Sequence, residues 1–192
     1  MIGMIKLHPK TFAVGTRRLF GLQTIRRLTR QQDGAAAVEF GMVAAPFLAL
    51  VFAIMETAMV FFAGQVLETA AADSARLIMT GQAQNQSFDQ SKFKEEVCAR
   101  VFGLFNCSGG VHIDVKTYTS FASVDTSPPI DSNGNLIQNF GYQPGLPGDI
   151  VVVRLFYQWP VYVPLLGFNL ADMAGGKRLM AATVAFRNEP YK

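Results

Sequence analysis

The sequence predicts an α+β protein in which a long N-terminal helix precedes a small head with a second helix and an antiparallel sheet. Three observations lead to this fold class. An apolar run has the length needed to cross a bilayer, a segment with helical periodicity follows it, and β-rich segments lie toward the C-terminus. Half of the 192 residues are hydrophobic and 16% are charged, below the roughly 25% typical of soluble domains. This length suits one modest domain plus an anchor.

The apolar run covers residues 40–64, where Glu56 is the only charged residue. At about 1.5 Å per residue, a helix over this run reaches roughly 37 Å, which exceeds the bilayer core of about 30 Å. A cleaved secretory signal has an apolar region of only about 7–15 residues. We therefore expect a membrane-spanning helix over residues 35–64. Helical spacing of apolar residues continues it through 65–81, where Gly81 is a plausible C-terminal cap.

The charges are distributed unevenly. Residues 1–33 carry a net charge of +6, and residues 65–192 carry −1. The seven basic residues of the N-terminal segment are Lys6, Lys10, Arg17, Arg18, Arg26, Arg27 and Arg30. Basic tails can bind nucleic acid, but a basic tail beside a membrane-length run is better explained by retention of positive charge in the cytoplasm. The sequence thus predicts a single-pass membrane protein with a cytoplasmic leader over 1–34, a head over 82–192 on the opposite side of the membrane, and no nucleic-acid partner.

Two carboxylates belong to the predicted anchor. Glu39 precedes Phe40 at the cytoplasmic edge of the apolar run, and Glu56 approaches the opposite edge. Glu56 either reaches outward to lipid headgroups or faces the helices of partner proteins, since charges inside membranes usually mark functional sites. The depth of Glu56 in the membrane does not decide between these two readings.

The segment GAAAVEF, residues 34–40, follows the basic leader directly. It resembles the processing site of type IV pilin-like proteins, in particular the tight-adherence (Tad, or Flp) branch. The resemblance implies that a prepilin peptidase cuts between Gly34 and Ala35 and leaves the apolar helix attached. Glu39 is then the fifth residue of the mature chain.

The C-terminal half carries a second resemblance. The segments GDIVVVRLFYQWPVYVPLLG (148–167) and VAFRNEPY (184–191), together with the cysteine pair, are similar to those of TadE-like proteins, the minor pseudopilins of the tight-adherence (type IVc) pilus system. This resemblance implies a pilin-like fold and a role in assembly or initiation of the pilus. It also implies three kinds of partner: other pilins and pseudopilins, the inner-membrane platform of the pilus, and prepilin peptidase.

If the chain is cut after Gly34, Glu39 can neutralise the positive charge that the cut creates. Cleavage leaves an α-ammonium group, with a reference pKa near 8, on Ala35 at the membrane boundary. The carboxylate of Glu39 on a neighbouring subunit neutralises this cation, and opposite charges attract more strongly away from bulk water. Glu39, Phe40 and Glu56 are therefore the candidate residues for helix packing during assembly.

Cys98 and Cys107 lie in the predicted periplasmic head. Their spacing is neither C-x-x-C nor part of a wider set of metal ligands. In an oxidising periplasm the natural expectation is a disulfide. In the cytosol the two residues would instead be free thiols. The topology of the chain decides between these alternatives.

The head shows helix, strand and turn signals in order. Residues 84–107 read as a helix with a capping box from Ser87 to Gln90, and residues 111–121 as a strand with Val111, Ile113 and Val115 on the buried face and His112, Asp114 and Lys116 on the other. Asn133-Gly134 marks a turn, and residues 148–160 and 177–190 read as two further strands.

The apolar connection over residues 161–170 has two readings. It forms a partner-binding patch, or Trp159, Tyr162 and Leu165 cover the sheet as part of the core. We expect the second reading, in which these residues belong to the core.

The sequence contains no recognisable catalytic constellation. His8 lies in the leader and His112 on a strand, and no phosphate-binding glycine loop links a strand to a helix. We expect neither an enzyme nor a cofactor or metal site. Two functions remain: a pseudopilin cut after Gly34, or an uncleaved single-pass anchor whose head binds a partner or ligand.

Overall fold

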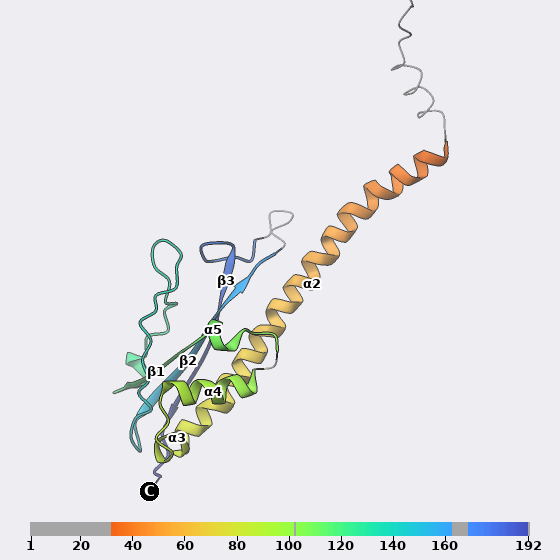
Figure 1. Ribbon diagram of the computed structural model, residues 1–192. Helices are drawn as coiled ribbons and strands as arrows, with labels where there is room; N and C mark the ends of the chain where they lie inside the picture. Colours follow the sequence, from red (N-terminus) through yellow and green to blue (C-terminus); the bar gives the residue numbers. More distant parts are fainter. Residues whose placement is uncertain (1–31, 102, 163–168, 192) are drawn as a thin grey trace, which may run out of the picture. The chain divides into compact units, whose positions relative to one another are not determined.

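The computed structural model describes residues 32–101, 103–162 and 169–191. The basic leader and Leu165 lie outside these residues, so the predictions made for them stay predictions. The chain forms two compact units, residues 1–47 and 48–192. Its elements are α2 (Gln32–Met79), α3 (Gln82–Asn85), α4 (Gln90–Arg100), α5 (Cys107–Gly110), β1 (Val111–Tyr118), η1 (Phe121–Ser123), β2 (Ile150–Pro160) and β3 (Lys177–Arg187) (Figure 1). The predicted α+β fold with a long N-terminal helix is confirmed.

Helix α2 is continuous over 48 residues and contains Pro46. Within the second unit, small and aliphatic side chains at intervals of three or four residues bury one stripe of the helix against the head. The buried members of the stripe are Val60, Ala63, Leu67, Ala70, Ala71, Ser74, Ala75 and Ile78. The head therefore begins to pack on α2 inside the segment predicted to span the membrane.

Gly81 ends the long helix as predicted. Its φ of 77° lies in the left-handed region, and its N–H donates to the carbonyl of Ile78 at 3.0 Å. A Cβ at this position would lie 2.2 Å from the ring of Tyr191, so glycine is required here for close approach as well. The N–H of Glu189 donates to the carbonyl of Met79 at 2.9 Å. The C-terminal segment thus covers the end of α2.

Helix α4 differs from its prediction at both ends. Asp89, not Ser87, is the N-cap, and its carboxylate accepts a hydrogen bond of 2.7 Å from the N–H of Lys92. Ser87 instead has a positive φ of 52° and belongs to the turn before the helix. The helix ends at Arg100 rather than near Cys107. Phe93 and Val97 are buried, as predicted.

The three strands form one antiparallel sheet in the order β1-β2-β3. Val153 in the central strand pairs with Val115 on one side and Val184 on the other. Alternate residues of the sheet join α2 and α4 in the main core, including Val111, Ile113, Val115, Val151, Val153, Leu155, Met180 and Ala182. The predicted strands are therefore confirmed, with the first ending at Tyr118 and the third at Arg187.

The opposite face of the sheet is also covered, which the alternating pattern of β1 did not predict. Asp114 is only 1% exposed, and its Oδ2 lies 2.6 Å from the guanidinium of Arg154, itself 8% exposed. The N–H of Gly141 donates to Asp114 at 2.9 Å, and Phe140 stacks on Phe156 with ring centroids 5.5 Å apart. The connection from β1 to β2 thus converts the expected polar face into a second core.

The two remaining loop predictions have different outcomes. The turn at Asn133-Gly134 is confirmed, since Gly134 has a φ of 79° and donates to the carbonyl of Asp131 at 3.0 Å. Trp159 packs edge-on against Phe105, with ring centroids 5.9 Å apart, as a core residue would. Tyr162, however, is 78% exposed, so its assignment to the core is wrong.

Candidate functional site

The predicted processing site lies near the start of α2. Gly34 and Ala35 are exposed, and a Cβ built on Gly34 would meet no atom within 4 Å. Both residues are helical. Cleavage therefore requires the first turn to unwind, and a glycine in a helix lowers the cost of unwinding by roughly 0.5–1 kcal/mol relative to alanine.

The residues that follow present an apolar surface. Phe40 is 75% exposed, and Glu39 beside it is exposed as well. Other large exposed residues continue along α2: Val38, Met42, Val43, Phe47, Leu48, Leu50, Phe52, Ile54 and Met55. By length and composition this helix, over Gly34–Met79, is a candidate membrane span. This helix is compatible with a single-pass membrane anchor.

Glu56 contacts the head directly. The backbone N–H of Tyr162 donates to Glu56 Oε1 at 2.5 Å, across 106 positions of sequence. Neither of the two readings of Glu56 from the sequence included a contact within the chain. No local pattern signals it, because the two residues are joined only through the folding of the whole head.

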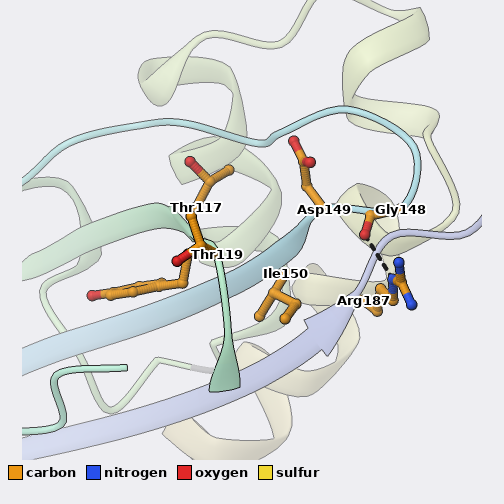
Figure 2. Close-up of a pocket in the computed structure, with 7 residues that line it drawn as sticks. Thr117, Thr119, Gly148, Asp149, Ile150 and Arg187 are labelled. Atoms are coloured by element: carbon orange, nitrogen blue, oxygen red, sulfur yellow. Dashed lines mark hydrogen bonds between the residues drawn. The ribbon is translucent and has the colours of Figure 1, made fainter. Parts of the chain in front are cut away.

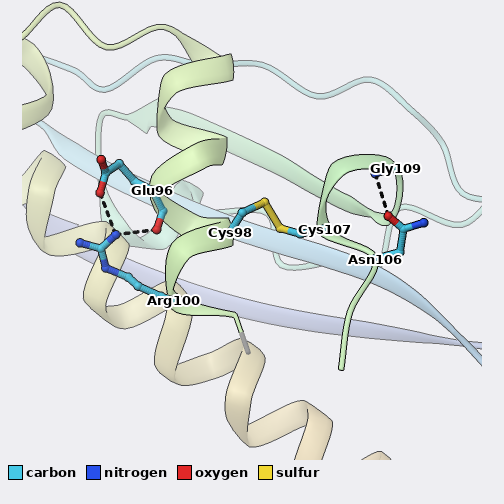
Figure 3. The surroundings of a disulfide bond; sticks show 6 residues. All are labelled: Glu96, Cys98, Arg100, Asn106, Cys107 and Gly109. Atoms are coloured by element: carbon cyan, nitrogen blue, oxygen red, sulfur yellow. Dashed lines mark hydrogen bonds and ion pairs between the residues drawn. A yellow bond between two sulfur atoms is a disulfide. The ribbon is translucent and has the colours of Figure 1, made fainter. Parts of the chain in front are cut away.

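The disulfide expected in the head is present. Cys98 in α4 and Cys107 at the start of α5 are bonded, with their Cα atoms 5.7 Å apart (Figure 3). The bond joins the last turns of α4 to the segment that leads into β1. Near it, Arg100 pairs with Glu96 at 2.9 Å, and Asn106 Oδ1 accepts from the N–H of Gly109 at 3.3 Å. The disulfide therefore links α4 covalently to the segment that follows it.

A hollow of about 370 Å³ lies where the three strands meet the turn before β2 (Figure 2). Its charged groups are already engaged. Arg187 Nε donates to the carbonyl of Gly148 at 2.7 Å, and Asp149 Oδ2 accepts from the N–H of Leu146 at 2.8 Å. These groups serve the turn, so the hollow offers little polar chemistry to a ligand.

His112 lies on the second face of the sheet. Its ring centroid is 5.4 Å from that of Phe140. Burial, followed by the positive charge of Lys94, lowers the pKa of His112 below its ordinary value. In the described part of the chain, no group of three or more His, Cys, Asp or Glu residues is placed to hold a metal ion.

Comparison with models of protein families gives a match to part of α2. Residues 34–76 match the family model described as TadE-like protein. Neither the curated proteins nor the solved structures contain a match to this chain. The matched segment begins at Gly34, passes through Glu39 and Glu56, and ends in the part of α2 that packs on the sheet. The match agrees with the resemblance predicted from the sequence: residues 34–76 of this chain are similar to the TadE-like family.

Proposed function

We propose that the protein is a minor pseudopilin that serves in the assembly or initiation of a tight-adherence (Flp-type) pilus. The observation that carries the proposal is the coincidence of the TadE-like match with the candidate membrane span in α2, both beginning at Gly34. The match by itself supports a role connected with the Tad pilus. We add to this role two specific steps: cleavage of the chain after Gly34, and packing of α2 against the helices of other subunits.

The spacing of Ala35 and Glu39 suits assembly after cleavage. The two residues are four positions apart, so they lie on the same face of α2 about one turn from each other. When two parallel helices pack with an axial offset of about one turn, the carboxylate of one lies beside the new ammonium of the other. This attraction favours lateral association and sets the stagger of neighbouring subunits.

The proposed placement puts the leader in the cytoplasm and the head in the periplasm. The excess of basic residues before Asp33 supports this orientation. The Cys98–Cys107 disulfide supports it as well, because disulfides persist in oxidising compartments. In this placement prepilin peptidase meets Gly34 at the cytoplasmic edge of the membrane. Other pilins and the inner-membrane platform meet the exposed surface of α2.

The first test is the N-terminal residue of the mature protein purified from its own membranes. We expect Ala35. Replacing Gly34 by Val should leave the chain uncut without disturbing the fold, because the added side chain meets empty space. A chain that still begins near Met1 would exclude the pseudopilin mechanism and favour the uncleaved anchor with a partner-binding head.

Glu39→Ala provides the second test. Cleavage should be retained while the yield of assembled pili falls at least several-fold, because the ammonium of Ala35 loses its counter-charge. Glu68→Ala is the matched control: Glu68 is an exposed acid of the same helix, held by Gln65 Nε2 at 3.2 Å. Equal piliation in both variants would remove Glu39 from the assembly mechanism.

A further inference from the structure

Tyr162 is exposed beside the membrane-facing part of α2. Its side chain is 78% exposed, while its backbone N–H is bonded to Glu56 Oε1. Tyr162 lies two residues after Pro160, which is the last residue of β2. The hydrogen bond therefore fixes the end of the central strand at the level of Glu56 on the helix.

The apolar surface of α2 continues beyond Glu56. Phe61 is 71% exposed, and Met59 and Phe62 are exposed as well, while Val60 and Ala63 are buried against the head. From residue 65 onward the exposed side chains become largely polar: Gln65, Glu68, Thr69, Asp73 and Arg76. For about two turns, α2 thus presents apolar side chains outward while it packs against the head on its other side.

The length of the helix gives the depth of these turns. From Glu39, at the cytoplasmic edge of the apolar run, to Glu56 the rise is roughly 26 Å, which brings Glu56 near the outer edge of a bilayer core of about 30 Å. Phe62 lies roughly 9 Å further along, about 35 Å from Glu39, which places it within the outer headgroup layer. Tyr and Trp are enriched in that layer because their rings are apolar at one end and polar at the other.

We infer that the head rests on the membrane, with Tyr162, Phe61 and Phe62 in the outer headgroup layer and the Glu56–Tyr162 hydrogen bond holding the head there. The inference rests on the membrane span of the proposed function. Its partner is the lipid surface, because the exposed aromatic residues continue the apolar surface of the candidate span without a break. The head also supplies a hydrogen-bond donor to a carboxylate at the edge of the hydrocarbon, where an unsatisfied charge is costly.

The experiment uses the full chain, reconstituted at a low protein-to-lipid ratio into phosphatidylcholine–phosphatidylglycerol vesicles with brominated phosphatidylcholines. Trp159 is the only tryptophan of the chain, so Trp159→Phe gives a background in which single reporters can be placed. The reporters are Tyr162→Trp, Phe52→Trp in the apolar part of α2, and Phe121→Trp on η1. All three parent residues are exposed.

We expect the reporter at 162 to be quenched most by lipids brominated near the headgroup, the reporter at 52 most by lipids brominated deep in the chain, and the reporter at 121 by neither. Quenching at 52 without quenching at 162 would overturn the inference and leave the membrane anchor intact. It is the result expected if the exposed aromatic surface around Tyr162 binds other pilins, which are absent from these vesicles, instead of lipid. Absence of quenching at 52 would overturn the anchor as well.

Variants of Glu56 test the hydrogen bond separately. Glu56→Ala removes the acceptor, and we expect shallow quenching at 162 to fall at least twofold. Glu56→Gln keeps an acceptor oxygen of similar reach and should retain most of the quenching. Glu68→Ala, on the same helix, serves as the control. If Glu56→Ala leaves quenching at 162 unchanged, Glu56 does not hold the head on the membrane.

Discussion

The ion pair between Asp114 and Arg154 lies at the centre of the second core of the head. Arg154 donates to Asp114 Oδ2 from two nitrogens, at 2.6 and 3.2 Å, and to the carbonyl of Asp125 at 3.1 Å. Lys116 adds a contact of 3.1 Å with the same carboxylate oxygen. The buried charges are paired and hydrogen-bonded, so the cost of their desolvation is offset only while both partners are present.

Asp114→Asn should lower the free energy of unfolding by about 3–5 kcal/mol, because Arg154 then remains buried without the carboxylate that pairs with it. Asp114→Leu combined with Arg154→Met should be closer to wild type than the single change, since no unpaired charge is left. Denaturant unfolding of the full chain in detergent, followed by the fluorescence of Trp159, measures both. A double variant as unstable as the single would show that the pair acts through its shape rather than its charge.

Tyr142 makes the head sensitive to high pH. Its hydroxyl is buried and has no hydrogen-bond partner among the described residues, and desolvation, with a smaller contribution from Asp89, raises its pKa to about 12. The unfolded chain loses this proton near pH 10. The folded state holds the proton more tightly, so the stability from Tyr142 is present below about pH 10 and is lost as the pH rises toward about 12.

Tyr142→Phe should change stability by less than about 0.5 kcal/mol at pH 7, because no hydrogen bond is lost and the ring contact with Phe93, 5.5 Å between centroids, is kept. Between pH 9.5 and 11.5 the variant should lose less stability than wild type. Thermal unfolding midpoints of both proteins over this range provide the measurement. Parallel pH curves would show that Tyr142 ionises alike in the folded and unfolded chains.

At the scale of elements, the disulfide connects α4 to the segment before β1. Replacing both Cys98 and Cys107 by Ser should lower the free energy of unfolding by about 2–3 kcal/mol, the value that the chain-entropy model gives for so short a loop. Wild-type protein treated with dithiothreitol should match the double variant. If neither treatment shifts the unfolding midpoint, the bond does not constrain the unfolded chain to the extent that the model requires.

Elements that depend on local pattern were predictable from the sequence. The long helix follows from its apolar run, and β2 from an uninterrupted series of β-branched and aromatic residues. The alternating pattern puts Asp114 on a polar face, because that pattern carries no signal that the connection from β1 to β2 folds back over the face. The cap of α4 was misplaced by two residues because the turn at Phe88, whose N–H donates to the carbonyl of Ala83 at 2.8 Å, delays the helix.

The candidate site divides in the same way. The motif at Gly34 and the cysteine pair are local signals in the sequence, and the bond between the cysteines is present. The contact between Glu56 and Tyr162 depends on the return of the chain after β2 to the level of the apolar helix. A sequence pattern read one segment at a time contains no signal for such a contact.

At the scale of the whole molecule, the orientation of the chain in the membrane decides how its parts work together. A periplasmic head places the disulfide in an oxidising compartment and the Gly34–Ala35 bond on the opposite side of the membrane, where the leader is retained. With the head in the cytoplasm, the disulfide would lie in a reducing compartment, and the Gly34–Ala35 bond would not lie on the cytoplasmic side of the membrane. The processing and assembly that we propose, and the formation of the disulfide, therefore all depend on this orientation.

Phe121→Cys tests this orientation. Phe121 is exposed on η1, and the native cysteines are joined in the disulfide, so the introduced thiol is the only reactive one expected. A membrane-impermeant maleimide added to spheroplasts should label this variant without lysis and leave wild type unlabelled, because the head faces the periplasm. Labelling of the variant only after lysis would place the head in the cytoplasm. Labelling of wild type without reductant would mean that Cys98 and Cys107 are reduced in the cell, which removes the disulfide as an argument for a periplasmic head.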